Sequence, residues 1–196
     1  MTHSRTRDLA RIATFAGFIA ALGLVPAVSP FGFPVPITIQ TLGIMIAGAI
    51  LGARQAAGAV LLFLLLVALG LPLLSGGRGG LGVFAGPSAG YLIGFPIAAY
   101  VIGTLIFRRG APYSFGWGLF SIITGGIVVL YLIGIPVTAW RAGLSLPAAA
   151  VGSAPFLVGD LVKAVVAATV AGAVHRAQPN LLPARSATPR QKVTAS

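Results

Sequence analysis

The sequence is poor in charged residues and lacks the groups on which many soluble enzymes and metal proteins depend. Its 196 residues include no cysteine, which excludes disulfide bonds and thiolate metal sites. Only two residues are acidic and 8% are charged, whereas soluble domains carry about a quarter charged residues. So few charges cannot cover a surface that faces water. Together with a hydrophobic content of 57%, this composition predicts an integral membrane protein.

Apolar runs divide the chain into segments of roughly membrane-spanning length. A crossing needs about 20 residues, so the chain is long enough for six crossings with short loops. The runs are 12–28, a short helix from Gln40 to about Leu51, 55–69, 91–107, 113–137 and 156–174. The first run resembles a signal peptide, but its length and the lack of a clean cleavage site favour a retained helix. We predict an all-α protein with six transmembrane helices.

The polar ends of the chain suggest a simple domain organisation. We expect a polar N-terminal arm over residues 1–11 and a single six-helix transmembrane domain over residues 12–176. Residues 177–196 are basic, contain three prolines and have no apolar periodicity, which predicts a disordered tail. His175 lies beside Arg176 at the end of the last run, where we expect a solvated helix terminus and no metal ligand.

Three segments rich in proline or glycine separate the runs. Residues 29–38 hold three prolines, which cannot continue a regular helix, and residues 142–155 hold two, so we expect a connection at both places. Residues 77–82 match G-x-G-x-x-G but follow an apolar run and precede no suitably placed acid, which excludes a dinucleotide site. We expect these glycines to allow close approach of a ligand or helix. Pro87 and Ser88 predict the start of the next helix.

The distribution of basic residues predicts the orientation of the helices. If the N-terminus is cytoplasmic, ten Lys and Arg residues lie in cytoplasmic segments, and only Arg78 and Arg141 lie in outer ones. Cytoplasmic loops of membrane proteins carry such an excess, so we predict cytoplasmic N- and C-termini. The net charge of +11 is spread between apolar runs instead of forming a basic domain, so we expect no nucleic-acid partner.

Asp160 is the only acidic residue inside an apolar run, and Lys163 follows it on the same helical face. Ionisable residues at membrane depth usually face the protein interior and mark a substrate or ion path. The predicted topology brings Arg78 to the same outer side. Two interpretations stay open: the pair only neutralises itself at the interface, or it lines a small-molecule pocket open to the outside. No histidine, cysteine or second acid accompanies Asp160, so we expect no enzyme.

Three segments with this order and spacing resemble a known family. They are residues 36–41 (PITIQT), the loop 76–80 (GGRGG) continuing to 86–92 (GPSAGYL), and residues 159–163 (GDLVK). They are similar to the BioY family, the substrate-binding membrane (S) components of energy-coupling-factor (ECF) biotin transporters. The resemblance runs from the first helix to about residue 175. It implies a multi-pass protein of the bacterial cytoplasmic membrane that binds biotin from outside.

The resemblance also implies a set of binding residues and partners. We expect the ureido N–H groups of biotin to meet Asp160 and a cation to meet its carbonyl or carboxylate, with the assignment of the two cations left open. The substrate-binding residues expected are Asp160, Lys163, Arg78, Gly80, Gly82, Ser88, Tyr91, Gln40 and Phe33. No cofactor is expected, since biotin is the cargo. An S component for another vitamin and a structural membrane subunit are the alternatives.

A stripe of small residues on the first helix is a candidate docking surface. The stripe comprises Ala13, Ala16, Gly17 and Ala20. Small residues at this spacing let another helix approach closely in lipid, either within this protein or from a separate subunit. The family resemblance implies that the partner is the transmembrane coupling protein, which works with two ABC ATPases. The chain itself has no Gly-Lys-Ser/Thr sequence for nucleotide binding.

Overall fold

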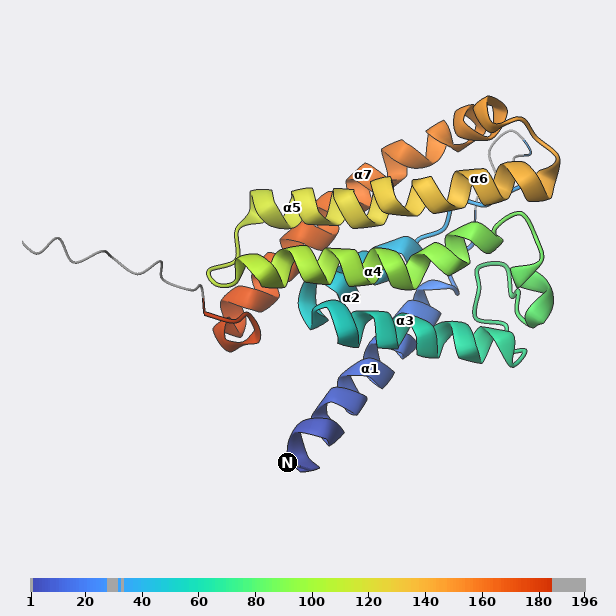
Figure 1. Cartoon of the computed structure of the whole chain (residues 1–196). Coiled ribbons are helices and arrows are strands. Elements are labelled where there is room, and N and C mark those ends of the chain that lie inside the picture. Colours follow the sequence, from blue (N-terminus) through green and yellow to red (C-terminus); the bar gives the residue numbers. More distant parts are fainter. Residues whose placement is uncertain (1, 28–31, 33, 185–196) are drawn as a thin grey trace, which may run out of the picture.

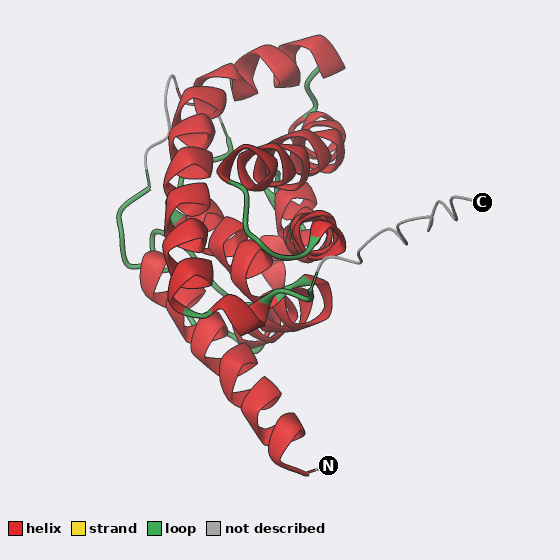
Figure 2. Cartoon of the chain, turned by 90° about the vertical axis from the view of Figure 1, so that its left-hand side faces the viewer, coloured by secondary structure: helices red, strands yellow, loops and turns green. Residues whose placement is uncertain are grey.

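The computed structural model describes residues 2–27, 32 and 34–184, and within this part the chain forms helices and loops without strands (Figures 1 and 2). The helices are α1 (Thr2–Leu22), α2 (Gln40–Leu51), α3 (Ala53–Ala68), α4 (Ala89–Arg109), α5 (Phe115–Ile123), α6 (Leu130–Ala142) and α7 (Leu146–Ala177). Because a π-helical segment, Thr124–Val129, joins α5 to α6 without a break, the chain has six helical rods among these residues. The six predicted helices are therefore confirmed.

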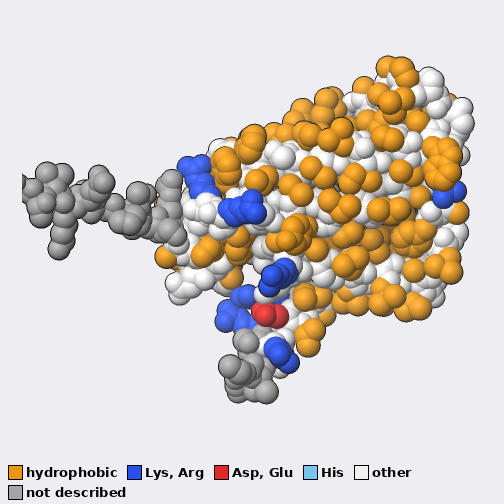
Figure 3. Space-filling view, in the orientation of Figure 1, with side chains coloured by type: hydrophobic (Ala, Val, Ile, Leu, Met, Phe, Trp, Pro, Cys, Tyr) orange, Lys and Arg blue, Asp and Glu red, His pale blue; other side chains and the backbone are white. Residues whose placement is uncertain are grey.

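The outer surface of the bundle is apolar, as a membrane environment requires. Hydrophobic side chains cover most of the face in Figure 3, and Lys and Arg gather toward the ends. Three rods, namely α4, the continuous α5–α6 rod and α7, are long and apolar enough to cross a bilayer. The helices α2 and α3 are shorter, with 12 and 16 residues. The short second helix agrees with the length predicted from the sequence.

The bundle is packed around α4 and the inner face of α7. The central helix α4 contacts α2, α3 and α6, while α7 contacts α2, α5 and α6 (Figure 1). Ala164, Ala167, Ala168 and Ala171 form a fully buried stripe on α7. Small side chains let helices approach closely and pack by van der Waals contact in lipid. The opposite face of α7, which includes Val158 and Val162, is exposed and apolar.

The last helix differs from the sequence-based expectation. Residues 142–155 were expected to form a connection, but α7 begins at Leu146 and passes through Pro155. Ser145 caps its first turn by accepting a hydrogen bond from the Ala148 N–H at 3.3 Å, and Pro147 lies in that turn, where its missing N–H costs nothing. Proline inside a helix is tolerated in membrane proteins because neighbouring groups satisfy the freed carbonyl. Asp160 therefore lies in the middle of a helix and not at its start.

The described residues near both ends include helical structure that the sequence did not predict. Residues 2–11, expected as an arm, belong to α1, which projects from the bundle in Figure 1. After α7 a short helical turn, Pro179–Leu181, folds back, and the Ala111 N–H donates to the Pro183 carbonyl at 2.9 Å. Residues 185–196 of the expected tail lie outside the described residues.

Candidate functional site

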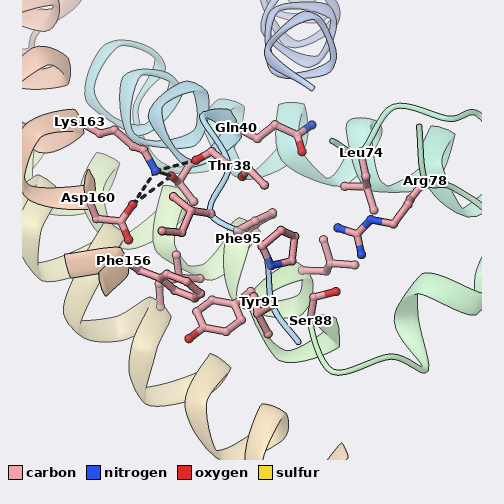
Figure 4. A pocket seen from close by; sticks show the side chains of 16 residues that line it. Thr38, Gln40, Leu74, Arg78, Ser88, Tyr91, Phe95, Phe156, Asp160 and Lys163 are labelled. Carbon is pink, nitrogen blue, oxygen red and sulfur yellow. Dashed lines mark hydrogen bonds and ion pairs between the residues drawn. The ribbon is translucent and has the colours of Figure 1, made fainter. Parts of the chain in front are cut away.

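A cavity opens between α2, α4, α6, α7 and the segments that precede α2 and α4 (Figure 4). It contains about 570 Å³ of space free of protein atoms, a value that includes open solvent at its mouth. Its lining comprises Val35, Pro36, Ile37, Thr38, Gln40, Thr41, Leu74, Arg78, Ser88, Tyr91, Leu92, Phe95, Leu130, Phe156, Asp160 and Lys163. The cavity thus combines apolar walls with a few polar groups, as sites for small ligands usually do.

One end of the cavity is a network centred on Asp160 and Lys163. Lys163 Nζ lies 2.9 Å from Asp160 Oδ1, and the two side chains are 13% and 6% exposed. The same ammonium donates to the Thr38 carbonyl at 2.6 Å and to Thr41 Oγ1 at 3.0 Å. An ammonium has three N–H donors, so all three are used inside the protein. Lys163 therefore holds the segment before α2 and the start of α2 against α7.

Asp160 is held by a second helix as well. Its Oδ2 accepts a hydrogen bond from the Tyr131 hydroxyl of α6 at 2.8 Å, and Oδ1 also accepts from Thr41 Oγ1 at 3.3 Å. A carboxylate oxygen has two lone pairs, so Oδ2 keeps one acceptor position for a further donor. The carboxylate is thus fixed in orientation and still able to accept an N–H group from a ligand.

Aromatic side chains form the wall next to this network. The Tyr91 ring meets Tyr131 edge to face, with centroids 6.2 Å apart, and meets Phe156 in the same way at 6.5 Å. Ser153 Oγ donates to the Ala149 carbonyl at 2.8 Å, so the Tyr91 hydroxyl is the donor in its 3.3 Å hydrogen bond to Ser153 Oγ. Tyr91 therefore offers the cavity its ring, while its hydroxyl is used to join α4 to α7.

The opposite end of the cavity carries Arg78 and Ser88, with Tyr91 and Phe95 between the two ends (Figure 4). Arg78 Nε donates to the Ser75 carbonyl at 3.3 Å, and its two terminal nitrogens make no hydrogen bond with any described residue. The Ser88 side chain likewise caps nothing and has no hydrogen-bond partner in the described part of the chain. A guanidinium with four free N–H groups is suited to a carboxylate, which it binds with two parallel hydrogen bonds.

Gln40 positions the glycine-rich loop that carries Arg78. Its side chain is 2% exposed, and its Nε2 donates to the Leu73 carbonyl at 2.9 Å and, at 3.4 Å, to the Ile19 carbonyl. Its Oε1 accepts from the Ser75 N–H at 3.3 Å. The amide is thus fully engaged within the protein, although the residue borders the cavity. Gln40 acts on the site by fixing the backbone of residues 73–75.

The other glycines expected in the site lie elsewhere. Gly80 has a φ of +82°, and its N–H donates to the Val67 carbonyl at 2.7 Å, which folds the loop onto the end of α3. Gly82 belongs to a short helical turn, Leu81–Phe84, and neither glycine lines the cavity. They shape the loop without bordering the site because Arg78 is the part of the loop that reaches inward. Phe33 lies outside the described residues.

Sequence reasoning found six of the described lining residues and missed other residues of the site. The cavity lining includes Asp160, Lys163, Arg78, Ser88, Tyr91 and Gln40, and their role in substrate binding stays a prediction. Thr38, Thr41 and Tyr131 were missed, although they hold the charged pair in place. Thr38 and Thr41 lie in the family-like segment 36–41, which could have drawn attention to them, whereas Tyr131 is marked only by a hydroxyl within an apolar run. Phe95 was also missed, because one more aromatic residue in an apolar run carries no distinguishing mark.

The structure also bears on two further expectations, one about His175 and one about the small-residue stripe on α1. His175 is 4% exposed, and its Nε2 lies 2.9 Å from the Ala49 carbonyl, so the expectation of a solvated histidine is wrong. It is buried because its ring stacks on Tyr113 with centroids 5.2 Å apart.

On α1, Ala16 is packed into the protein's own core, whereas Ala13 and Gly17 are exposed and Ala20 is half-buried. The stripe therefore turns only part of its surface outward.

The apolar surface, the helical bundle and the half-polar cavity define an integral membrane protein with an internal small-molecule site. The BioY family model matches residues 1–180. The chain is 52% identical to a biotin transporter of Rhizobium etli, over 92% of this chain and 99% of that one, and 48% identical to a biotin transporter of Rhodobacter capsulatus, over 91% and 98%. The chain belongs to the BioY family.

A solved structure supports the same assignment at the level of the fold. A crystal structure of the S component for biotin from an ECF-type ABC transporter is similar to this chain with a TM-score of 0.85. The alignment covers 90% of this chain and 94% of the other, at 27% sequence identity. The six-helix arrangement is therefore the S-component fold, which agrees with a transport component and not an enzyme.

Proposed function

We propose that this protein is the biotin-binding S component of an ECF-type transporter and that it takes up biotin across the bacterial cytoplasmic membrane. Relatives named biotin transporters and the similar biotin S component support the substrate. The observation that carries the proposal is the division of the cavity into two unlike polar ends, Asp160–Lys163 and Arg78–Ser88, with aromatic walls between them (Figure 4). Biotin has the same division, with a ureido ring at one end and a carboxylate at the other.

The free hydrogen-bonding groups of the cavity favour one orientation of biotin. The ureido ring offers N–H donors, and Asp160 Oδ2 has an acceptor position left beside Tyr131. The carboxylate needs donors, and the Arg78 guanidinium and the Ser88 hydroxyl are unused, whereas Lys163 has spent all three N–H groups. We place the ureido ring against Asp160 and the carboxylate against Arg78. The thiophane ring and aliphatic tail then lie along Tyr91, Phe95 and Phe156.

The topology and partners follow from the same proposal. With ten basic residues on the side of both termini, the N- and C-termini are cytoplasmic and the cavity opens outward. Because the similar biotin S component belongs to an ECF-type ABC transporter, we propose two ABC ATPases and a transmembrane coupling protein as partners. The exposed part of the small-residue stripe, Ala13 and Gly17, is the surface offered to that coupling protein. Biotin is cargo, and no cofactor takes part.

A titration of radiolabelled biotin onto the detergent-purified protein tests the function. Saturable binding of one biotin per chain is expected. If the folded protein shows no saturable binding of biotin but binds another vitamin in a competition panel, that vitamin would replace biotin as the proposed substrate. Arg141→Gln is the matched control for Arg78→Gln. Arg141 is an exposed arginine whose guanidinium lies over Trp140, away from the cavity.

The orientation is tested by comparing biotin with biotinamide, which lacks the negative charge at the tail. We expect Arg78→Gln to weaken binding of biotin by about tenfold to a hundredfold, the worth of a hydrogen bond to a charged group, and to leave binding of the amide unchanged. Asp160→Asn is expected to weaken both ligands equally, because both carry the same ureido ring. Equal weakening of biotin and biotinamide by Arg78→Gln would place the ureido ring against Arg78. That result would reverse the orientation without affecting the proposed function.

A further inference from the structure

A second cavity lies at the end of the bundle that the proposed topology places in the cytoplasm. It is formed by the turn between α2 and α3 and by the last turns of α4. Its lining comprises Leu51, Gly52, Ala53, Arg54, Gln55, Tyr100, Gly103, Thr104, Phe107 and Arg108. It shares no residue with the substrate cavity, so its role is separate from binding of the transported ligand.

Two arginines from different helices meet at this cavity without a partner. Arg54 lies in the first turn of α3 and Arg108 in the last turn of α4, and neither guanidinium forms an ion pair or hydrogen bond with any residue that the structure describes. The neighbouring Arg109 differs, because its guanidinium lies over the Trp117 ring at 5.3 Å. Neither of the two acids of the chain lines the cavity; Asp8, on α1, accepts a hydrogen bond from Gln55 Nε2 at 2.8 Å. The cavity thus has an excess of positive charge.

An exposed apolar stripe leads from these arginines toward the middle of the bundle. Ile93, Ile97 and Tyr100 are about half exposed, and their spacing of four and three residues places them on one face of α4. Thr104 and Arg108 continue the same face at four-residue steps. At about 1.5 Å per residue, the stripe from Ile93 to Arg108 extends about 22 Å along the helix. One surface therefore carries cations at the membrane interface and an apolar track below them.

We propose that this cavity binds the headgroup of an anionic phospholipid. The phosphodiester lies between Arg54 and Arg108, and an acyl chain lies along Ile93, Ile97 and Tyr100. Basic pockets between transmembrane helices on the cytoplasmic side are typical sites for anionic headgroups. A free phosphate would satisfy the two guanidinium groups alone, but only a lipid uses the apolar track as well. The charge and the track together favour the lipid.

Native mass spectrometry of the full chain, released from detergent supplemented with lipid, tests this site. Phosphatidylglycerol and phosphatidylcholine with the same acyl chains are compared. We expect the wild-type protein to retain phosphatidylglycerol preferentially. Arg54→Gln and Arg108→Gln are each expected to lower its retention about fivefold, corresponding to about 1 kcal/mol per cation near the surface. Arg141→Gln, with the same loss of charge at the other end of the bundle, is expected to change nothing.

The possible outcomes separate a lipid site from its alternatives. Equal retention of the two lipids, or equal loss in Arg54→Gln and Arg141→Gln, would overturn the proposal. Displacement of phosphatidylglycerol by excess inorganic phosphate, with thermal stabilisation by phosphate alone, would reassign the cavity to a soluble anion. Biotin binding by both variants is the control for folding, since neither arginine lines the substrate cavity. Retained biotin binding with lost lipid preference is the expected combination.

Discussion

The hydroxyl of Tyr131 donates a hydrogen bond to Asp160 Oδ2 at 2.8 Å and so joins α6 to α7 inside the cavity. Oδ1 of the same carboxylate accepts from Lys163 and from Thr41, which belongs to α2. Three helices therefore fix the position of one negative charge. Because the donors are already in place, the carboxylate needs little rearrangement to receive a ligand, and this preorganisation lowers the entropic cost of binding.

Tyr131→Phe removes one hydrogen bond to the carboxylate and leaves the ring in place. We expect affinity for biotin to fall by about tenfold, since Asp160 becomes less well oriented and hydrogen bonds to charged groups contribute about 1.5–3 kcal/mol. Equilibrium binding of radiolabelled biotin measures the change. Tyr100→Phe is the control, because that side chain is exposed on α4 and does not line the cavity. Unchanged affinity in Tyr131→Phe would show that the other contacts of Asp160 suffice.

The pair Asp160–Lys163 is expected to affect both folding and binding. Lys163→Met alone leaves a buried carboxylate without its cation, and Asp160→Leu alone leaves a buried ammonium. Removing one partner of a buried ion pair costs about 3–5 kcal/mol. We therefore expect each single variant to lower the midpoint of thermal unfolding in detergent and to lose biotin binding.

The double variant Asp160→Leu/Lys163→Met separates the two effects. Replacing both charges by apolar groups leaves no unpaired charge, so we expect higher thermal stability than in either single variant. Binding of biotin is expected to stay absent, because no group remains to accept the ureido N–H. Thermal unfolding and biotin titration of the same preparation check both statements. A double variant that is stable and still binds biotin would remove the pair from the proposed site.

Gly134 is predicted to be essential for the aromatic wall. A methyl group on Gly134 would lie 2.5 Å from Cε1 of Tyr91, so Gly134→Ala must displace that ring, which lines the cavity. Overpacking of this kind costs about 1–3 kcal/mol, and we expect biotin affinity to fall together with thermal stability. Gly159→Ala is the matched control, since a methyl group there meets nothing within 4 Å. That variant is expected to bind as the wild type does and to gain slightly in helix stability.

His175 is expected to contribute to stability and not to binding. His175→Phe keeps an aromatic ring against Tyr113 but removes the hydrogen bond to the Ala49 carbonyl, at a cost of about 1 kcal/mol. For a chain of this length, such a loss lowers the unfolding midpoint by about 2–4 °C. Biotin affinity should not change, because His175 does not line the substrate cavity. A parallel fall in affinity would indicate that the two ends of α7 are coupled.

The charged residues of the site could be predicted from the sequence because charge is rare in this chain. Asp160 and Lys163 are visible in an apolar run, and Arg78 is visible in a loop of glycines. The hydroxyl groups could not be sorted in the same way. Thr104, Thr124 and Thr169 donate to carbonyls of their own helices, whereas Thr41 accepts from Lys163. Residue type alone does not separate a threonine that bonds to its own helix from one that builds a site.

The helix boundaries were predictable where a basic residue or glycine ends a run and were missed where proline lies inside one. Gly110 follows Arg109 and ends α4 close to the expected place. Pro155 suggested a connection, but α7 continues through it, because the helix is set by packing against α2, α5 and α6. The π-helical segment Thr124–Val129 has no sequence signal either. Within this segment Gly126 lies so close to Met45 that a methyl group would clash, a contact that only the assembled bundle provides.

The polar network of the cavity also links binding to the order of synthesis. The hydrogen bond from Lys163 to the Thr38 carbonyl joins positions 125 residues apart, and the one from Thr41 to Asp160 joins positions 119 apart. Chains leave the ribosome from the N-terminus, so α7 is the last helix to enter the membrane. Until it does, the cavity lacks Asp160, Lys163 and Phe156. Ligand binding is therefore a property of the completely inserted chain, and a ribosome-stalled intermediate that lacks α7 has no site to fill.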